Sequence, residues 1–227
     1  MKNPEGCQPC FCFGLSKECH EKQWNRGEIR NTTGWMLTDV SGELMIAPKT
    51  ESQVLMYTNS EHKNNELCYW KAPKEFNGNL LNSYGGNLQY YVYFVPMGNG
   101  EQTFLADIII EGNGIKLEYY SRQNFFPREN ISIQIPMKEG NGWQNANMRT
   151  PVNKHEMMRV LADVNTLMIR AVYNREQIQS SIYGLTLDIA IEPEDTTEHA
   201  ESQASDALMR TVEVCKCPEY YAGNSCE

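Results

Sequence analysis

The cysteines of this chain gather at its two ends, and this distribution limits the possible folds more than any other feature. Of the eight cysteines, four lie in the first 19 residues and three in the last 13, while Cys68 stands alone between them. Crowded cysteines indicate either disulfides or a zinc site. Zinc favours paired C-x-x-C knuckles or nearby histidines, but both doublets here are Cys-x-Cys and only His20 lies near a cluster. We therefore expect disulfides and an oxidising compartment.

Composition divides the chain into one large folded zone and two small pieces. Residues 1–21 and 212–227 are short and cysteine-rich, whereas residues 22–211 contain no cysteine except Cys68. Hydrophobic residues make up 41% of the chain, which is enough for a core of ordinary size. An acidic stretch follows Ile191 and predicts an exposed connection to the second cysteine cluster. The sequence thus predicts a domain at 22–211 with a small disulfide-rich piece at each end.

Most of the central domain is predicted to be β-strand. Residues 131–135 and 185–191 alternate strictly between apolar and polar types, which is the period of a strand with one buried face. Runs of β-branched and aromatic residues predict further strands at 90–95, 107–111, 115–120 and 167–173. Turns rich in glycine and asparagine separate several of them, at 84–87, 97–100 and 111–114.

One short helix is expected among these strands. Asn153 can cap its N-terminus, and Glu156 follows three residues later as in a capping box. An apolar stripe continues the pattern, formed by Met157, Met158, Leu161 and Val164. Many strands, one helix and no β-α-β alternation predict a mainly β fold, an antiparallel β-sandwich. We favour a jelly roll, because about 170 residues exceed the usual immunoglobulin-type size.

The cysteine-rich ends resemble a known family. Residues 7–19, CQPCFCFGLSKEC, resemble the start of a laminin IV type A domain, also called an L4 domain, which in that family interrupts a laminin-type EGF-like module. Residues 215–226, CKCPEYYAGNSC, are similar to the resuming half of such a module. Further stretches resemble the same family in its own order, namely GWMLTD at 34–39, YWKAP at 69–73, SYGG at 83–86, IIEGNG at 109–114 and LMIRA at 167–171.

The resemblance implies a jelly-roll sandwich similar to carbohydrate-binding modules, with the halves of a split EGF-like module at its ends. It also implies a non-catalytic structural and interaction module of a secreted basement-membrane glycoprotein, either a laminin α or γ chain or a perlecan-like proteoglycan. The implied partners are the neighbouring EGF-like modules of the same chain, and other laminin chains or matrix proteins. Two residues depart from the family pattern: Cys68 is not usual there, and Tyr220 replaces a common glycine.

The EGF-like pattern of the family implies how the cysteines pair: first with third, second with fourth, and fifth with sixth. Carried onto this sequence, the pattern gives Cys10–Cys19, Cys12–Cys215 and Cys217–Cys226. Cys7 is then the last cysteine of a preceding module. Cys68 is left over, either as a buried free thiol or as a partner for Cys7. Its apolar neighbours Leu67, Tyr69 and Trp70 favour the buried thiol.

Several further features bear on location and partners. Sequons beginning at Asn31 and Asn130 predict N-glycosylation at both residues and agree with secretion. The first residues contain no apolar h-region, so we expect no signal peptide within this sequence. No apolar run reaches the roughly 18 residues that cross a membrane, so no membrane insertion is expected. The net charge of −9, without a basic stripe, argues against binding to nucleic acid.

The sequence offers no residue set for catalysis, because its four histidines are scattered and the common nucleophile, zinc and phosphate motifs are missing. We therefore expect no enzyme. A glycan-binding module is the alternative, with exposed members of the four tryptophans and twelve tyrosines as contacts, although such residues more often fill a sandwich core. Related sandwich folds often hold a structural calcium ion, and the candidate oxygen ligands are Asp39 and Asp188.

Overall fold

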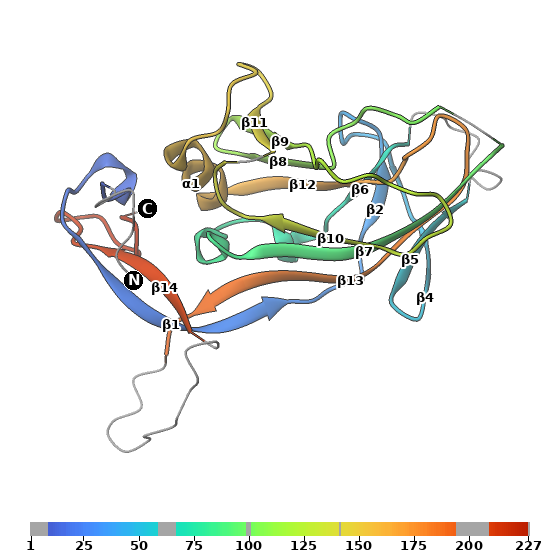
Figure 1. Cartoon of the computed structure of the whole chain (residues 1–227). Helices are drawn as coiled ribbons and strands as arrows, with labels where there is room; N and C mark the ends of the chain where they lie inside the picture. Colours follow the sequence, from blue (N-terminus) through green and yellow to red (C-terminus); the bar gives the residue numbers. More distant parts are fainter. Residues whose placement is uncertain (1–8, 59–66, 99–100, 141, 194–208, 227) are drawn as a thin grey trace. The chain divides into compact units, whose positions relative to one another are not determined.

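The computed structural model describes residues 9–58, 67–98, 101–140, 142–193 and 209–226, and the chain forms two compact units (Figure 1). Unit 1 takes both ends of the sequence, Met1–Gly27 and Ile189–Glu227, whereas unit 2 is the continuous segment Glu28–Asp188. Cys7 and most of the acidic connection predicted after Ile191 lie outside the described ranges. The helices in these ranges are all too short or too polar to cross a membrane.

Unit 1 contains two paired strands, β1 (Cys19–Ile29) and β14 (Met209–Cys215), and the domain boundaries predicted from the sequence fall within them. β1 and β14 pair antiparallel over seven positions, from Cys19 opposite Cys215 to Asn25 opposite Met209. The predicted boundaries at residues 21 and 211 fall inside these strands, so the compact units divide the chain elsewhere, at Gly27 and Asp188. The reason is the ladder between two segments that lie far apart in the sequence, which no local pattern reveals.

Unit 2 is a sandwich of two antiparallel sheets, which confirms the predicted fold class (Figure 1). Within unit 2 the first sheet follows the order β10-β7-β13, and off this path β5 pairs with β13 and β4 pairs with β5. The bounds of β10, β7, β13, β5 and β4 are Ile131–Pro136, Asn87–Pro96, Gln177–Ile191, Val54–Thr58 and Lys49–Glu51. The second sheet has the order β11-β9-β8-β12-β6-β2-β3, with bounds Trp143–Asn145, Ile115–Tyr119, Ile108–Gly112, Val164–Arg170, Tyr69–Lys71, Met36–Thr38 and Met45–Ile46. Single 3-10 turns occur at η1 (Cys12–Gly14), η2 (Lys74–Phe76) and η3 (Leu81–Ser83).

Strict alternation builds the buried face of the first sheet. β10 buries its three isoleucines and exposes the residues between them. β7 likewise buries every second residue, including Leu88, Tyr90, Val92 and Phe94. The central strands of the second sheet differ, because Ile108, Ile109 and Ile110 of β8 are consecutive and all buried. Both faces of β8 are therefore covered, as the near-continuous apolar run IIIEG suggests.

The α-helix of the described residues, α1 (Lys154–Ala162), begins as the sequence predicts. Asn153 Oδ1 accepts from the Glu156 backbone N–H at 3.0 Å, and Glu156 Oε2 accepts from the Asn153 N–H at 3.1 Å, which completes the capping box. Val164 is not part of the helix but starts β12. The turn between them lies against Gly112, where an added β-carbon would be 2.5 Å from the Asp163 carbonyl oxygen. Only glycine permits that approach of β8 to the turn after the helix.

Cys68 is a free, buried thiol, and we expect it to resist alkylation in the native protein. It packs with Tyr69, Ala106, Ile109 and Met168 and is 8% exposed. Burial raises the pKa of the thiol from 9.0 to about 12. The fraction of Cys68 in the reactive thiolate form near neutral pH is therefore lowered by roughly 1000-fold. Mass spectrometry after iodoacetamide treatment should show modification of Cys68 only in denaturant. Rapid labelling of the native protein at this residue contradicts the prediction.

Candidate functional site

Among the described residues, unit 1 holds three disulfides, and one of them joins the two ends of the chain. They link Cys10 to Cys19, Cys12 to Cys215 and Cys217 to Cys226, which are the pairs that the family resemblance implies. The middle bond spans 203 residues of sequence and holds its two α-carbons 5.7 Å apart. Cys12, Cys215 and Cys226 are buried, and the other three half-cystines pack around them. The sulfur atoms thus supply a core that a segment this small cannot build from hydrophobic side chains.

Polar contacts reinforce the join between the two halves of unit 1. The Phe11 backbone N–H donates to Glu213 Oε1 at 2.7 Å, and the Lys216 backbone N–H donates to the Glu18 carbonyl oxygen at 2.9 Å. The Lys216 and Glu18 side chains also form an ion pair at 3.0 Å, but both are largely exposed. Exposed pairs of this kind contribute little, so the disulfide and the backbone contacts carry the join.

The chain leaves and re-enters unit 1 at neighbouring points. Its departure point is Gly27 at the end of the β1–β14 ladder, and its return point is Ile189. A β-carbon added at Gly27 would lie 3.4 Å from Cγ1 of Ile189 and 2.8 Å from Cγ1 of Ile191. The ends of the inserted segment are therefore adjacent, which is the usual geometry for an inserted domain. We use the word clamp for three features together: the Cys12–Cys215 disulfide, the paired strands β1 and β14 beside it, and the adjacent points Gly27 and Ile189.

The structure gives little support to a metal site. Among the described residues, the group of possible ligands close enough to hold an ion is Cys12, Glu213 and Cys215. Two of these three form a disulfide, so they offer no thiolate. The group contains neither of the aspartates that the sequence suggested as calcium ligands.

Asp39 and Asp188 instead accept hydrogen bonds from nearby donors. Asp39 accepts from the Ser41 hydroxyl at 2.7 Å and from the Gly42 N–H at 3.0 Å. The Ser41 bond chiefly, with those of the Leu44 and Glu43 N–H groups, holds the pKa of the carboxyl below its usual value. Asp188 accepts from the backbone and side-chain nitrogens of Asn87, at 3.1 and 3.2 Å. Calcium requires oxygen ligands, and each of these carboxyls has a hydrogen-bond donor within 3.2 Å of one of its oxygens. Calcium stays a prediction, which the melting temperature with and without chelator tests.

The two sequon asparagines differ in their surroundings. Asn130 is exposed and lies directly before β10. Asn31 is half-buried between β1 and β2; its Oδ1 accepts from the Thr33 N–H at 2.7 Å, and its carbonyl oxygen accepts from Trp35 Nε1 at 2.8 Å. Neither side chain is buried, so glycosylation of both stays a prediction.

The tryptophans fill the interior, as the sequence analysis favoured. Trp24, Trp35, Trp70 and Trp143 are exposed by 6%, 2%, 0% and 2%, and so none of them can stack on a sugar. Tyr91 of β7 is exposed, but its ring stacks on that of Tyr183 with centroids 5.2 Å apart and planes at 11°. The two rings face each other rather than forming an open platform.

Buried Arg170, the last residue of β12, is a feature that sequence reasoning missed. Its Nη1 donates to Asp107 Oδ1 at 3.0 Å, and its Nη2 donates to the Thr103 hydroxyl at 3.0 Å. The second oxygen of Asp107 accepts from the Ser121 N–H at 2.7 Å. The guanidinium also lies 4.5 Å from the centroid of the Tyr173 ring, close enough for a cation–π contact. Arg170 therefore fastens three chain segments together at one end of unit 2.

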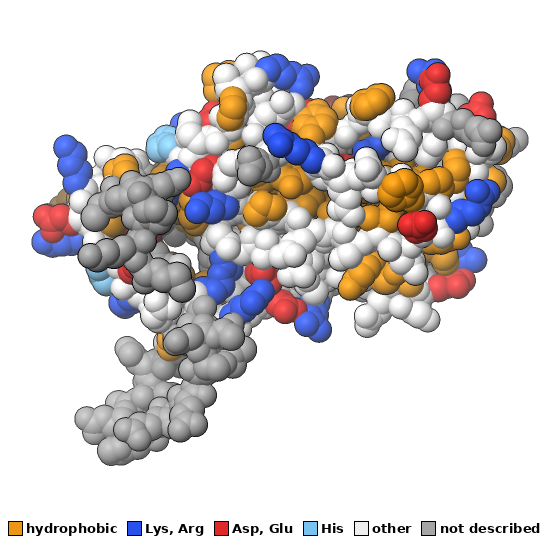
Figure 2. All heavy atoms as spheres, in the orientation of Figure 1, with side chains coloured by type: hydrophobic (Ala, Val, Ile, Leu, Met, Phe, Trp, Pro, Cys, Tyr) orange, Lys and Arg blue, Asp and Glu red, His pale blue; other side chains and the backbone are white. Residues whose placement is uncertain are grey.

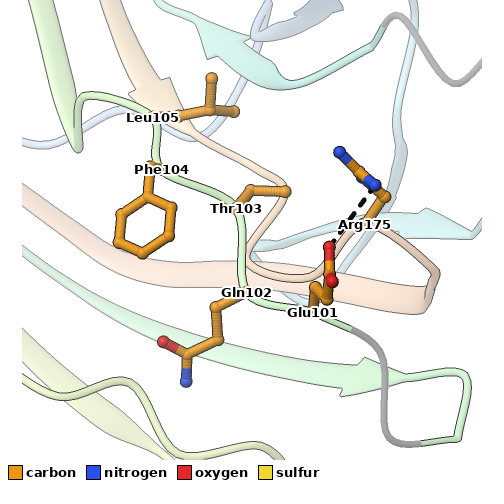
Figure 3. A pocket seen from close by; sticks show the side chains of 6 residues that line it. All are labelled: Glu101, Gln102, Thr103, Phe104, Leu105 and Arg175. Carbon is orange, nitrogen blue, oxygen red and sulfur yellow. Dashed lines mark ion pairs between the residues drawn. The ribbon is translucent and has the colours of Figure 1, made fainter.

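The 101–105 segment that Arg170 fastens borders a shallow hollow of about 690 Å³ (Figure 3). Glu101 and Arg175 form an ion pair at 3.4 Å on its rim, and the Phe104 ring projects beside it with 97% exposure. Other hydrophobic side chains also interrupt the polar surface on the face shown in Figure 2. The sequence did contain a signal for buried Arg170, namely a lone arginine within the apolar run LMIRAV at 167–172, but we interpreted that run only as a strand.

Comparisons with known proteins agree with this geometry. The family described as laminin B (domain IV) matches residues 69–206. The chain is 33% identical over 248 residues to human laminin subunit alpha-1 and 31% identical over 235 residues to the basement membrane proteoglycan of Caenorhabditis elegans. These alignments cover 100% and 99% of this chain but only 7% and 6% of those proteins.

A solved structure shows the same fold. The L4b domain of human laminin alpha-2 superposes with a TM-score of 0.64 at 20% identity, covering 73% of this chain and 98% of that domain. The two-sheet sandwich, the split disulfide-bonded unit and the match over most of the central domain point to one family. The chain belongs to the laminin B (domain IV) family.

Proposed function

We propose that this chain is a non-catalytic structural and interaction module of a secreted basement-membrane glycoprotein. Unit 2 is a globular lobe, and unit 1 is one module of a disulfide-bonded rod that the lobe interrupts without breaking. The relatives support this role, because they include a laminin subunit and a basement membrane proteoglycan. The neighbouring modules of the same chain, and other matrix proteins, are the proposed partners.

The observation that carries the proposal is the clamp. A domain inserted in a rod interrupts it unless the two cut ends are joined again. Here Cys12 and Cys215 join them across 203 residues, and β1 and β14 pair beside the bond. Tension along the rod can then pass through the disulfide, so the lobe is free to space neighbouring modules or to offer a surface to a partner.

The test combines secretion with imaging. The chain, with a secretory leader and a globular fusion at each end, is produced in cultured animal cells. We expect secreted protein in which peptide mapping without reduction finds Cys12 linked to Cys215. Electron micrographs should show the two fusions side by side and one separate lobe. Fusions on opposite sides of the lobe, or Cys12 linked to another cysteine, contradict the proposal.

A further inference from the structure

We propose that an N-linked glycan on Asn130 protects the open edge of the first sheet, namely β10, against pairing with other chains. The inference rests on the proposed secretion, because N-glycans are added in the secretory pathway. The strand β10 requires protection, and a glycan at the sequon directly before it can supply that protection.

β10 has the chemistry of an aggregation-prone edge. It lies at the end of the sheet order, and in the described part of the chain β7 is its strand partner. Its residues, ISIQIP, carry no charge, and three of them are β-branched isoleucines. Short, uncharged, β-branched segments on a sheet edge readily pair with another copy. Pro136 interrupts donation only at the far end of the strand.

The free side of this edge can be located from one hydrogen bond. Gln123 Nε2 donates to the Ser132 carbonyl oxygen at 3.3 Å, in an exposed position. Ser132 therefore directs its backbone groups away from β7. Because neighbouring residues of an antiparallel strand alternate in this respect, Gln134 does so too. The segment from Asn130 to Gln134 thus presents a row of backbone donors and acceptors, and Gln123 covers one of them.

The other edges of unit 2 are protected in ways that β10 is not. β4 carries Lys49 and Glu51, both exposed and paired at 3.1 Å. β3 is only two residues long. The outer side of β11 is covered by chain: the Val152 N–H donates to the Trp143 carbonyl oxygen at 3.3 Å, and the Asn145 N–H donates to the Thr150 carbonyl oxygen at 2.9 Å. Charge, short length and a covering segment are the usual devices, and β10 lacks all three.

The sequon supplies the missing device at the correct place. Asn130 directly precedes β10 and is exposed, so the folded chain can accommodate a bulky glycan there. Ser132, the third residue of the sequon, is exposed on the strand, while Ile131 between them is 7% exposed and anchors it. A large hydrophilic glycan at the first position of an edge strand hinders a second chain from lying alongside it. The sequon at Asn31 has no such neighbour, because Asn31 lies in the loop between β1 and β2 and does not directly precede a strand.

The experiment compares four proteins secreted from animal cells: the wild type, Ser132→Ala, Ser132→Thr and Thr33→Ala. Ser132→Ala removes the Asn130 sequon and keeps the asparagine, Ser132→Thr retains the sequon, and Thr33→Ala removes the Asn31 sequon as a matched control. Site occupancy is measured by mass spectrometry of glycopeptides, and self-association by sedimentation velocity over a range of concentrations. Enzymatic deglycosylation of folded wild-type protein separates loss of the glycan from any fault in folding.

We expect Asn130 to be occupied, and Ser132→Ala and deglycosylated wild type to self-associate while Ser132→Thr and Thr33→Ala stay monomeric. Adding Gln134→Lys to Ser132→Ala should restore the monomer, because a lysine on an edge strand opposes pairing. A secreted, disulfide-intact protein with bare Asn130 overturns this inference and leaves the proposed function standing. Monomeric Ser132→Ala and monomeric deglycosylated protein overturn the protective role.

Discussion

Pulling this chain from its two ends should extend it by less than about 10 nm while the Cys12–Cys215 bond is intact. After that bond is reduced, the 203 residues that it spans should add about 70 nm, at roughly 3.3–3.6 Å for each extended residue. The difference arises because the disulfide removes unit 2 from the path of the force. Single-molecule force spectroscopy with and without reductant measures it directly.

Two variants make the test specific to the clamp. In Cys12→Ser/Cys215→Ser the long extension should occur without reductant. In Cys217→Ser/Cys226→Ser it should not, because that disulfide closes a separation of only 9 residues outside the inserted segment. The same contrast should appear in stability, since closing a loop of about 200 residues is worth roughly 5 kcal/mol in the chain-entropy model. Long extension of the oxidised wild type is the result that would falsify the clamp.

Asp107→Ala should destabilise unit 2 by about 3–5 kcal/mol, because it leaves the buried charge of Arg170 without its counter-ion. The two side chains are exposed by only 4% and 8%, and their charged atoms lie 3.0 Å apart. The variant also removes the acceptor for the Ser121 N–H, which Asp107 binds at 2.7 Å. Denaturant unfolding followed by tryptophan fluorescence reports the loss, because Trp35, Trp70 and Trp143 are all buried in unit 2.

The matched control is a second ion pair close to the first. Arg175 and Glu101 are 79% and 80% exposed, so Glu101→Ala should cost less than about 1 kcal/mol. The double variant Asp107→Leu/Arg170→Met should be less destabilised than Asp107→Ala, because replacing a buried pair by apolar groups removes the unpaired charge. If Asp107→Ala and Glu101→Ala have equal effects, Arg170 does not fasten this end of the sandwich.

Local pattern was enough for several elements of the structure. The alternation of 131–135 predicts β10, and that of 185–191 predicts the second half of β13. The capping residues Asn153 and Glu156 fix the start of α1. These features depend on residues that are close together in the sequence, so they can be predicted from the local pattern alone.

Short strands and the boundaries of the units were not predictable in this way. β2 and β3 have three and two residues, too few to show a period. The compact units divide the chain at Gly27 and Asp188 rather than at the predicted 21 and 211, because β1 and β14 pair with each other across about 190 residues of the chain.

The sequence by itself determined the two-part organisation of this protein and the class of its fold, since clustered cysteines demand cross-links and alternating residues demand a two-faced sheet. The tertiary structure alone decided which edge of the sandwich lies open, where Arg170 finds its counter-ion, and which side chains, such as Phe104, stay in solvent. The physical reason is that periodicity and spacing act between neighbours in the chain. Burial, strand order and ion pairing arise only when distant segments such as β8 and β12 are brought together.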